Sequence, residues 1–361
     1  MGGYTRVAGA FPITLMNRSL HAVLLGTAVG DSLGLPAENL PPGRIQTRWP
    51  GPWVHRFVLD RGMVSDDTEH TVFVAQCLVE GAGDAASFQR KLAWKLRWWL
   101  LCLPAGIGFA TLRAILKLWL GYPRSRSGVF SAGNGPAMRS AIIGAYFAGQ
   151  DDDFTSTMAY VRASTRLTHT DPQAEIAARA VAMTAAWSIT NGRSTHVDGE
   201  AIRPSWLRAN LADDPVWPAL VERMLLAHDR QWTVAEFAQD LGLEKGVTGY
   251  AYHTVPVALY AWLRYHGDFR SGLEAVLNCG GDTDSVGAIT GALLAINSPI
   301  PEEWSEGLCD YPISRTYLEN LALAMESGGQ SLPPFAWAVL PFRNFAFLTV
   351  VLAHLYRRLI P

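Results

Sequence analysis

Apolar residues recur along this chain at three- and four-residue intervals, the spacing of amphipathic α-helices. Some predicted helix starts carry a further signal: Asp171 before Pro172 is typical of an N-cap followed by a first-turn proline. The only short stretch with strand character is residues 56–59. The pattern therefore predicts an all-α protein. Its helices are expected over residues 18–35, 67–80, 88–103, 136–148, 153–162, 172–190, 218–229, 233–241, 255–266, 269–278 and 285–295.

Two of these helices carry glycines along one side. Gly26, Gly30 and Gly34 recur every four residues in the first helix, and Gly287 and Gly291 do so in the last. A glycine inside a helix costs about 1 kcal/mol relative to alanine. Close backbone approach between two central helices would offset that cost, and incidental placement of the glycines is the alternative.

Length and composition predict one compact body. The chain has 361 residues, of which 49% are hydrophobic and 17% charged, so it can bury a large core and is not expected to be disordered. No linker divides it. We expect a single-domain globule of orthogonal helices over residues 1–300, with residues 301–361 as a C-terminal extension packed on the same domain.

Charge and hydropathy exclude several classes of protein. A net charge of −2 gives no general attraction to nucleic acid or to an anionic membrane. The N-terminus lacks a charged stretch followed by a continuous apolar core and a cleavage site, so we expect no signal peptide. The apolar stretch 335–356 is interrupted by Pro341, Arg343 and Asn344, which leaves too few residues to span a bilayer. We expect a soluble, cytoplasmic protein whose tail packs on its body, with a membrane-surface contact as the alternative; the sequence does not determine the oligomeric state.

Two residue types are expected to be structural. The four cysteines form no CxxC pair and are expected to be small buried residues in a reducing compartment. They are Cys77, Cys102, Cys279 and Cys309. A redox or ligand role is the alternative for Cys279. A tryptophan-rich stretch is likewise expected in the core, with stacking on an adenine as the alternative. Its members are Trp94, Trp98, Trp99 and Trp119.

A first acidic cluster, Ser65-Asp66-Asp67-Thr68-Glu69, leads into the predicted helix over residues 67–80. By itself it has a structural explanation, because serine and aspartate cap helices and acidic residues complement the helix dipole. Carboxylates this close nevertheless repel one another and resist ionisation unless a cation neutralises them.

A second cluster, GGDTDS at residues 280–285, favours a metal site. Asp282 and Asp284 lie two residues apart before the last predicted helix and can converge on one point. Oxygen ligands without nearby cysteine or paired histidine select a hard ion, Mg²⁺ or Mn²⁺, over Zn²⁺. If the fold brings the two clusters together, they form a site for two divalent ions.

Two further acidic residues lie near the first glycine-lined helix. Asp31 falls within the glycine-lined segment and is expected to be buried, where it either braces the site or contacts it. Glu38 follows Pro36 at the helix end, on a loop able to reach over a cavity. A solvated loop glutamate is the alternative for Glu38.

Two polar loops enter predicted helices. Residues 131–139, SAGNGPAMR, form a glycine-rich loop whose backbone N–H groups can cradle phosphate, and Ser127-Gly128 could extend it. The loop is not a Walker A sequence, since it lacks the lysine. Residues 168–172, THTDP, place polar groups at another helix start, where His169 could also be a simple cap or surface residue.

The ordered set GDSLGLPAE, SDDTE, SAGNGPAMR, THTDP and GGDTDS resembles the ADP-ribosylglycohydrolase family, which includes dinitrogenase-reductase-activating glycohydrolase and the ADP-ribosylhydrolases. The resemblance covers residues 20–296 and implies an all-helical fold with a binuclear Mg²⁺ cleft. Its two acidic motifs are the specific ones, and the others support them. The family often has threonine where Ser65 and Ser285 stand, and serine keeps the hydroxyl oxygen.

The resemblance also implies residue roles. The implied metal ligands are Ser65, Asp66, Asp67, Asp282, Asp284 and Ser285. Glu38 matches a glutamate implicated in catalysis, and either Glu38 or Asp67 could be the base. The implied ADP-ribose pocket is lined by Gly128, Ser131, Gly133, Asn134, Gly135 and His169.

The implied activity is Mg²⁺-dependent hydrolysis of the N- or O-glycosidic bond of an ADP-ribosylated protein or small molecule, with ADP-ribosyl-arginine as the favoured substrate. Two alternatives remain open at this point. One is a non-catalytic ADP-ribose-binding or crystallin-like structural protein, and the other is a hydrolase of another ribosylated small molecule or nucleic acid. Retention of the mutually repulsive carboxylates in both clusters favours the enzyme.

Overall fold

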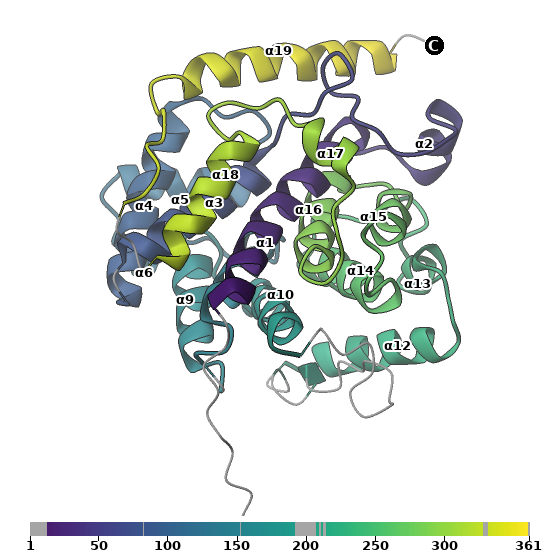
Figure 1. Ribbon diagram of the computed structural model, residues 1–361, viewed down its shortest axis with the longest axis horizontal. Helices are drawn as coiled ribbons and strands as arrows, with labels where there is room; N and C mark the ends of the chain where they lie inside the picture. The colour runs from purple at the N-terminus through teal and green to yellow at the C-terminus, as the bar shows by residue number, and fades with distance from the viewer. Residues whose placement is uncertain are drawn as a thin grey trace, which may run out of the picture.

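A computed structural model describes residues 13–359 apart from 82, 152, 192–206, 209–210, 212–213 and 328–330. It is built of helices wrapped around a central pair, α1 and α16 (Figure 1). No strand occurs among the described residues, and 56–59 contributes only to an isolated bridge between Val58 and Arg61. The prediction of a single-domain all-α fold is confirmed. The N-terminal residues, on which the expectation of no signal peptide rests, lie outside the described part.

The elements follow in chain order. They are α1 Ile13–Gly34, the 3-10 turn η1 Leu35–Ala37, α2 Pro42–Arg48, α3 Asp66–Glu80, α4 Ala85–Leu101, α5 Phe109–Trp119, α6 Arg124–Ser127, α7 Gly135–Met138, α8 Ala141–Phe147, α9 Thr155–Arg166, α10 Pro172–Asn191, α12 Trp217–Asp229, α13 Val234–Asp240, α14 Ala251–Arg264, α15 Phe269–Leu277, α16 Thr283–Leu294, α17 Glu302–Glu306, α18 Arg315–Glu326 and α19 Leu340–Leu359.

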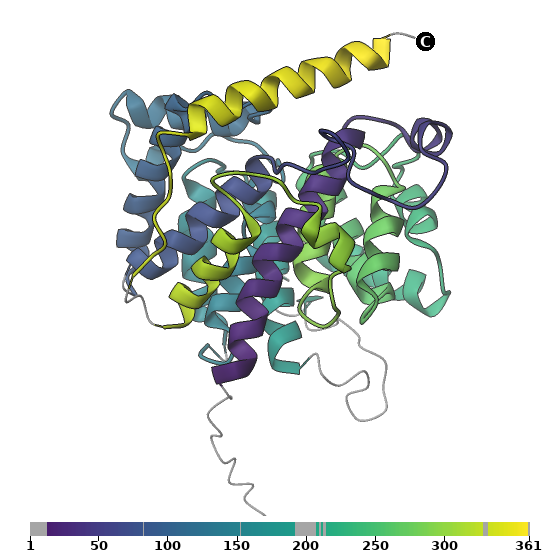
Figure 2. The same cartoon turned by 45° about the horizontal axis from the view of Figure 1, so that its top comes forward.

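The two glycine-lined helices pack backbone against backbone at the centre, where both views show them side by side (Figures 1 and 2). A Cβ on Gly30 would lie 2.0 Å from the Gly287 carbonyl oxygen, and one on Gly26 would lie 2.3 Å from that of Gly291. A Cβ on Gly34 would approach the Thr283 carbonyl oxygen equally closely. The predicted close approach is therefore confirmed, and it brings the C-terminal end of α1 to the N-terminal end of α16.

One stretch, Ser19–Ala37, is long and apolar enough to cross a membrane by composition alone. Within the protein, 89% of it is buried, as expected for the central helix of a globular core. Its apolar character therefore has an explanation in packing.

Several segments differ from the sequence-based expectation. The predicted helix over residues 136–148 is two helices, α7 and α8, because the chain leaves the helical path at Arg139 and Ser140. Helices α2, α5, α6, α17 and α18 were not predicted. Of the four tryptophans expected in the core, Trp99 is buried, whereas Trp94, Trp98 and Trp119 have large exposed fractions. Three cysteines are buried as expected, and Cys309 is exposed.

Helix α19 lies along the outside of the molecule (Figure 2). Its inner face packs on the segment between α2 and α3, where the Phe347 ring lies 4.8 Å from that of Phe57, and Leu35 belongs to the same small hydrophobic cluster. Helix α18 packs on α1 and α3.

Candidate functional site

The two acidic clusters meet. Ser65 caps α3, and Asp67 lies in the first turn of that helix. Asp67 Oδ2 accepts hydrogen bonds from the Ser65 hydroxyl of its own cluster and from the Ser285 hydroxyl of the other, each at 3.2 Å. The second of these bonds joins residues 218 positions apart, at the N-terminal ends of α3 and α16.

Two left-handed glycines shape the second cluster. Gly280 and Gly281 have φ of +67° and +83°, and a Cβ on Gly281 would lie 1.9 Å from the Val247 carbonyl oxygen. Their backbone bonds to Val247 on one side and to Leu40 on the other. Only glycine fits at these two positions, because φ is positive and there is no room for a Cβ. The resulting backbone path sets the direction in which Asp282 enters the site.

Three carboxylates converge beside these glycines. One oxygen each of Glu38, Asp282 and Asp284 lies within 4.8 Å of the others, close enough to share one cation. Glu38 and Asp282 are half-buried, whereas Asp284 is buried. Glu38 reaches this position from the end of η1, as the loop that follows Pro36 was expected to allow.

The electrostatics of the cluster disfavour ionised carboxylates without a counter-ion. Burial raises the pKa of Asp67 and Asp284 well above the usual value, and the neighbouring carboxylates raise it further. The pKa of Asp66 is raised well above its usual range by the same two causes. Asp67 Oδ1 is buried and has no hydrogen-bond partner among the residues that the structure describes. The arrangement therefore fits a group that supplies positive charge and accepts oxygen ligands.

Asp31 braces the first cluster. Its Oδ2 accepts hydrogen bonds from the backbone N–H of Ser65 at 2.9 Å, from the N–H of Thr68 at 3.2 Å and from the Thr68 hydroxyl at 2.5 Å. Burial raises the pKa of Asp31 to about 6, against the lowering effect of these bonds. Asp31 thus fixes the loop that presents Asp66 and Asp67.

A buried ion-pair network lies behind the same loop. Arg343 of α19 pairs with Glu69 at 3.2 Å and with Asp310, and it also donates to the Val64 carbonyl oxygen. Glu69 accepts a 2.6 Å hydrogen bond from the Trp99 indole. Burial raises the pKa of Glu69 to about 7, opposed by the charge of Arg343. The C-terminal helix is therefore anchored directly behind the first acidic cluster, which sequence reasoning did not foresee.

Asn134 connects the glycine-rich loop to the second cluster. Its side-chain amide donates to Asp282 Oδ2 at 2.6 Å and to the Thr254 hydroxyl at 3.1 Å. Its backbone N–H donates to the Gly249 carbonyl oxygen at 2.9 Å. The loop that was expected to hold phosphate therefore begins beside the carboxylates, with Ser131 and Gly133 half-buried next to it.

His169 lies under the same loop. Cβ atoms on Gly133 and Gly135 would each come within 3.2 Å of its ring, so both glycines allow the loop to lie close to the imidazole. The ring contacts the Thr168 hydroxyl through Nδ1 at 2.9 Å. Burial, and then the charge of Arg139, lower the pKa of His169 to about 3, so the ring is neutral at physiological pH.

Arg139 is the last residue of the SAGNGPAMR motif, but no role was predicted for it from the sequence. It is fully buried and donates to Ser164 and to the Thr168 hydroxyl at 2.8 Å. It thereby fixes the segment that carries His169. The signal available in the sequence was a charged residue inside an apolar helical pattern.

Gly128 is buried, and its place is explained by packing. A Cβ there would lie 2.7 Å from the Arg166 carbonyl oxygen, and its own carbonyl accepts from Lys117 at 3.0 Å. The adjacent Val129 bonds to Thr168 and Thr170 on either side of His169. Gly128 thus joins the two polar loops.

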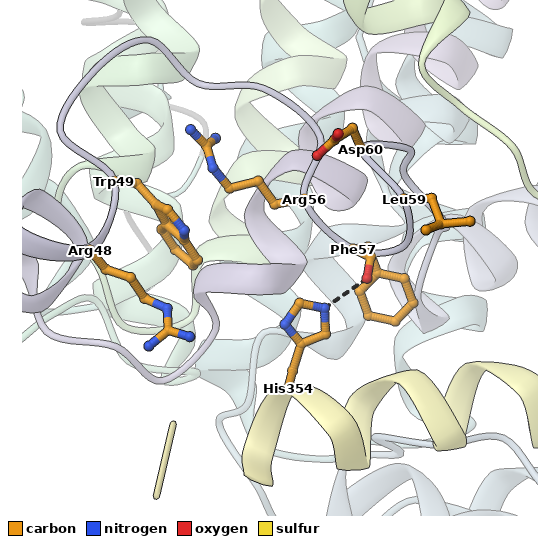
Figure 3. Close-up of a pocket in the computed structure, with 7 residues that line it drawn as sticks. All are labelled: Arg48, Trp49, Arg56, Phe57, Leu59, Asp60 and His354. Carbon is orange, nitrogen blue, oxygen red and sulfur yellow. Dashed lines mark hydrogen bonds between the residues drawn. The ribbon is translucent and has the colours of Figure 1, made fainter. Parts of the chain in front are cut away.

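A separate pocket of about 460 Å³ lies between α2 and α19 (Figure 3). It is lined by Arg48, Trp49, Arg56, Phe57, Leu59, Asp60 and His354. None of the predicted site residues lines it.

The helical fold and the joined acidic clusters define a recognised class of protein. The sequence profile of ADP-ribosylglycohydrolases matches residues 13–332, nearly the whole chain. The chain belongs to the ADP-ribosylglycohydrolase family. The match ends before α19, and it reaches beyond the segment 20–296 over which the motifs showed the resemblance.

Individual relatives agree with this assignment. An uncharacterized protein of Archaeoglobus fulgidus is 32% identical over 85% of this chain and 95% of its own length. The ADP-ribosyl-[dinitrogen reductase] glycohydrolase of Rhodospirillum rubrum is 27% identical, over 80% of this chain and 89% of that protein. A solved chain titled ADP-ribosylglycohydrolase-related protein complex superposes with a TM-score of 0.60 at 25% identity, covering 88% of this chain and all of that one.

Proposed function

We propose that this protein is a Mg²⁺-dependent hydrolase that releases ADP-ribose from an ADP-ribosylated substrate, with ADP-ribosyl-arginine on a protein as the favoured one. The observation that carries the proposal is the contact between the two acidic clusters, where the Ser285 hydroxyl donates to Asp67. Membership of a glycohydrolase family supports hydrolysis in general, and the R. rubrum relative is named for removing ADP-ribose from dinitrogen reductase.

The side chains of the two acidic clusters are suitable ligands for divalent cations. Asp282 and Asp284 of the converging group offer oxygen ligands of the kind that Mg²⁺ and Mn²⁺ prefer, and so does Asp67 Oδ1, which has no hydrogen-bond partner among the described residues. The ligands that we propose for two ions are Ser65, Asp66, Asp67, Asp282, Asp284 and Ser285. Bound there, the ions would offset the carboxylate charge and orient the distal ribose hydroxyls.

We assign the general base to Glu38. It is half-buried, so substrate and water can reach it, whereas Asp67 is buried and already accepts two hydroxyl hydrogen bonds. Cleavage of the glycosidic bond develops positive charge at the anomeric carbon, which a nearby carboxylate stabilises. Glu38 would take a proton from the attacking water as the water oxygen bonds to that carbon. The arginine side chain would leave with the glycosidic electron pair as a neutral guanidine, which then takes up a proton from solvent.

The remaining predicted residues would position the ADP-ribose. The loop from Ser131 to Gly135 would receive the diphosphate through its backbone N–H groups. Asn134 would hold that loop against the second cluster through its bond to Asp282. His169, neutral and buried, would support the loop from beneath.

Replacement of one carboxylate tests the proposal. Asp284→Asn should lower release of free ADP-ribose from ADP-ribosyl-arginine by at least about a hundredfold, because a ligand of the converging group is lost. Glu244→Gln, which changes an exposed acid outside the site, is the matched control and should keep full activity. Binding of ADP-ribose without any hydrolysis by the wild-type protein would instead favour a non-catalytic binder.

A further inference from the structure

The outward face of α19 is apolar and uncovered among the described residues. It presents Phe342, Phe345, Leu348, Leu352, Leu355 and Tyr356, and the Phe345 side chain is 74% exposed. The opposite face holds Arg343, Asn344 and Phe347 against the body. Both views show the helix running along the outside of the molecule (Figures 1 and 2). We propose that this face and the adjoining surface of α4 and α5 dock onto an anionic phospholipid bilayer.

The apolar face continues from α19 onto α4. The Asn344 amide donates to the Cys102 carbonyl oxygen at 2.8 Å, which places the turn after α4 against the first turns of α19. The residues on either side of Cys102, Leu101 and Leu103, are both exposed, Leu103 to 77%. Farther along, Trp98 and Trp119 contact edge to face at 6.4 Å and are both solvent-exposed. Tryptophan and leucine side chains in this combination suit a membrane interface, where the indole N–H stays in the polar layer.

Charge is unevenly divided between the chain segments that contain this surface and the rest of the sequence. Segments 85–150 and 327–361 contain no aspartate or glutamate and twelve lysines and arginines, whereas the rest of the chain has eighteen against 32 acids. Arg139 and Arg343 of the twelve are buried. Others alternate with the exposed aromatics: Arg97 lies over the Trp94 ring at 4.7 Å, and Lys117 lies over that of Tyr122 at 5.9 Å. Although the net charge of the chain is −2, the surface of α4, α5 and α19 combines basic and aromatic side chains, which complement anionic lipid headgroups.

The pocket of Figure 3 gives a headgroup a place beside the helix. His354 of α19 forms one wall, and its Nε2 lies 2.7 Å from the Phe57 carbonyl oxygen. The guanidinium groups of Arg48 and Arg56 lie over the Trp49 ring, at 5.8 and 5.6 Å from its centroid. Asp60 also lines the pocket and offsets one of these two charges. A lipid phosphate is the anion that would be present here when α19 lies in the interface.

Other occupants fit this surface less well. In a symmetric dimer the patch would meet its own copy, which sets cations opposite cations. Single-stranded nucleic acid would use the cations and stack bases on the aromatic rings, but it offers nothing to the leucines of α19. A bilayer satisfies both the aliphatic and the cationic groups.

Vesicle flotation with the full-length protein tests the proposal. We expect binding to vesicles of phosphatidylcholine with about a third phosphatidylglycerol, little binding to phosphatidylcholine alone, and release as salt rises and screens the charges. No binding to either vesicle, or equal binding to both, would overturn it.

Substitutions on the proposed surface test which side chains contact the vesicle. Phe345→Asp with Leu352→Asp should weaken vesicle binding by roughly tenfold or more, because two apolar side chains then carry charge into the interface. Leu323→Asp, on an exposed position of α18, is the matched control and should bind like the wild type. Arg113→Glu with Arg126→Glu should lower binding to anionic vesicles without altering the apolar face. Circular dichroism establishes that each variant is folded.

Two outcomes contradict the proposal even when every variant folds. Unchanged vesicle binding by both double variants would place the contact elsewhere. A wild-type dimer in sedimentation that Phe345→Asp with Leu352→Asp dissociates, without any vesicle binding, would assign the face to a second copy of the chain.

Discussion

Asn134 is the residue through which the loop and the acidic centre contact each other. Its amide donates to Asp282 Oδ2 at 2.6 Å and lowers the pKa of that carboxyl, against the burial that raises it. Nothing else in the proposed nucleotide loop has a described side-chain hydrogen bond to the two clusters. Burial raises the pKa of Asp282 overall, and this hydrogen bond both opposes that rise and ties the loop to the carboxylate.

Removal of this amide should impair both functions. Asn134→Ala is expected to lower kcat/KM for ADP-ribose release by about ten- to a hundredfold, since a hydrogen bond to a charged group is worth about 1.5–3 kcal/mol. Mg²⁺ affinity, measured by titration calorimetry, should fall with it. Asn191→Ala, which removes an exposed amide at the end of α10, is the control. Unaltered kcat/KM and Mg²⁺ affinity in Asn134→Ala would show that this contact is incidental.

Individual site residues could be predicted from the sequence where they belong to a short motif. Asp282 and Asp284 could be singled out because two carboxylates and two hydroxyls are more than a helix start needs. Asp31 could be predicted as buried, but its partners Ser65 and Thr68 depend on how α1 meets α3. The same holds for Arg343, whose partner Glu69 lies far away in the sequence.

The α1–α16 pair is the element on which the site depends. Its helices approach until Cβ atoms have no room, so the ends that carry Glu38 and Asp284 are held together. The four-residue glycine spacing predicted this contact correctly, because periodicity within one helix is a local property.

A methyl group at the crossing should separate the helices. Gly30→Ala is expected to lower the free energy of unfolding by about 3 kcal/mol, because a Cβ 2.0 Å from the Gly287 carbonyl oxygen outweighs the gain of about 1 kcal/mol in helix propensity. Gly43→Ala, in α2, meets no atom within 4 Å and should be neutral or slightly stabilising. Urea denaturation measures both. Equal stability of the two variants would contradict the packing argument.

Other elements could not be predicted from local pattern. The expected helix over 136–148 breaks because Arg139 turns inward to bond Ser164 and Thr168, a tertiary requirement that local helix propensity does not reveal. Trp98 and Trp119 were expected in the core because apolar residues usually are. Their exposure depends on which face of α4 meets α9 and which face of α5 meets α4.

Across the whole molecule, the site is assembled from segments that are distant in sequence. Residues from η1, the start of α3, the loop before α7, the loop before α10 and the start of α16 lie around one acidic centre. The order of these motifs along the chain was sufficient to indicate the family. The positions of the residues relative to one another could be determined only from the three-dimensional structure. Helix α19, beyond the family match, adds Arg343 behind the first cluster and an apolar face outside.

We propose that the joined acidic clusters hold divalent cations for glycosidic hydrolysis. The most direct measurement is the rate at which the full-length protein releases free ADP-ribose from ADP-ribosyl-arginine after thorough chelation, followed by stepwise return of Mg²⁺. We predict that release stops in the chelated protein and recovers with added Mg²⁺, because the raised pKa values of Asp67 and Asp284 disfavour their charged forms without a cation. Undiminished release after chelation would show that hydrolysis does not depend on a divalent cation.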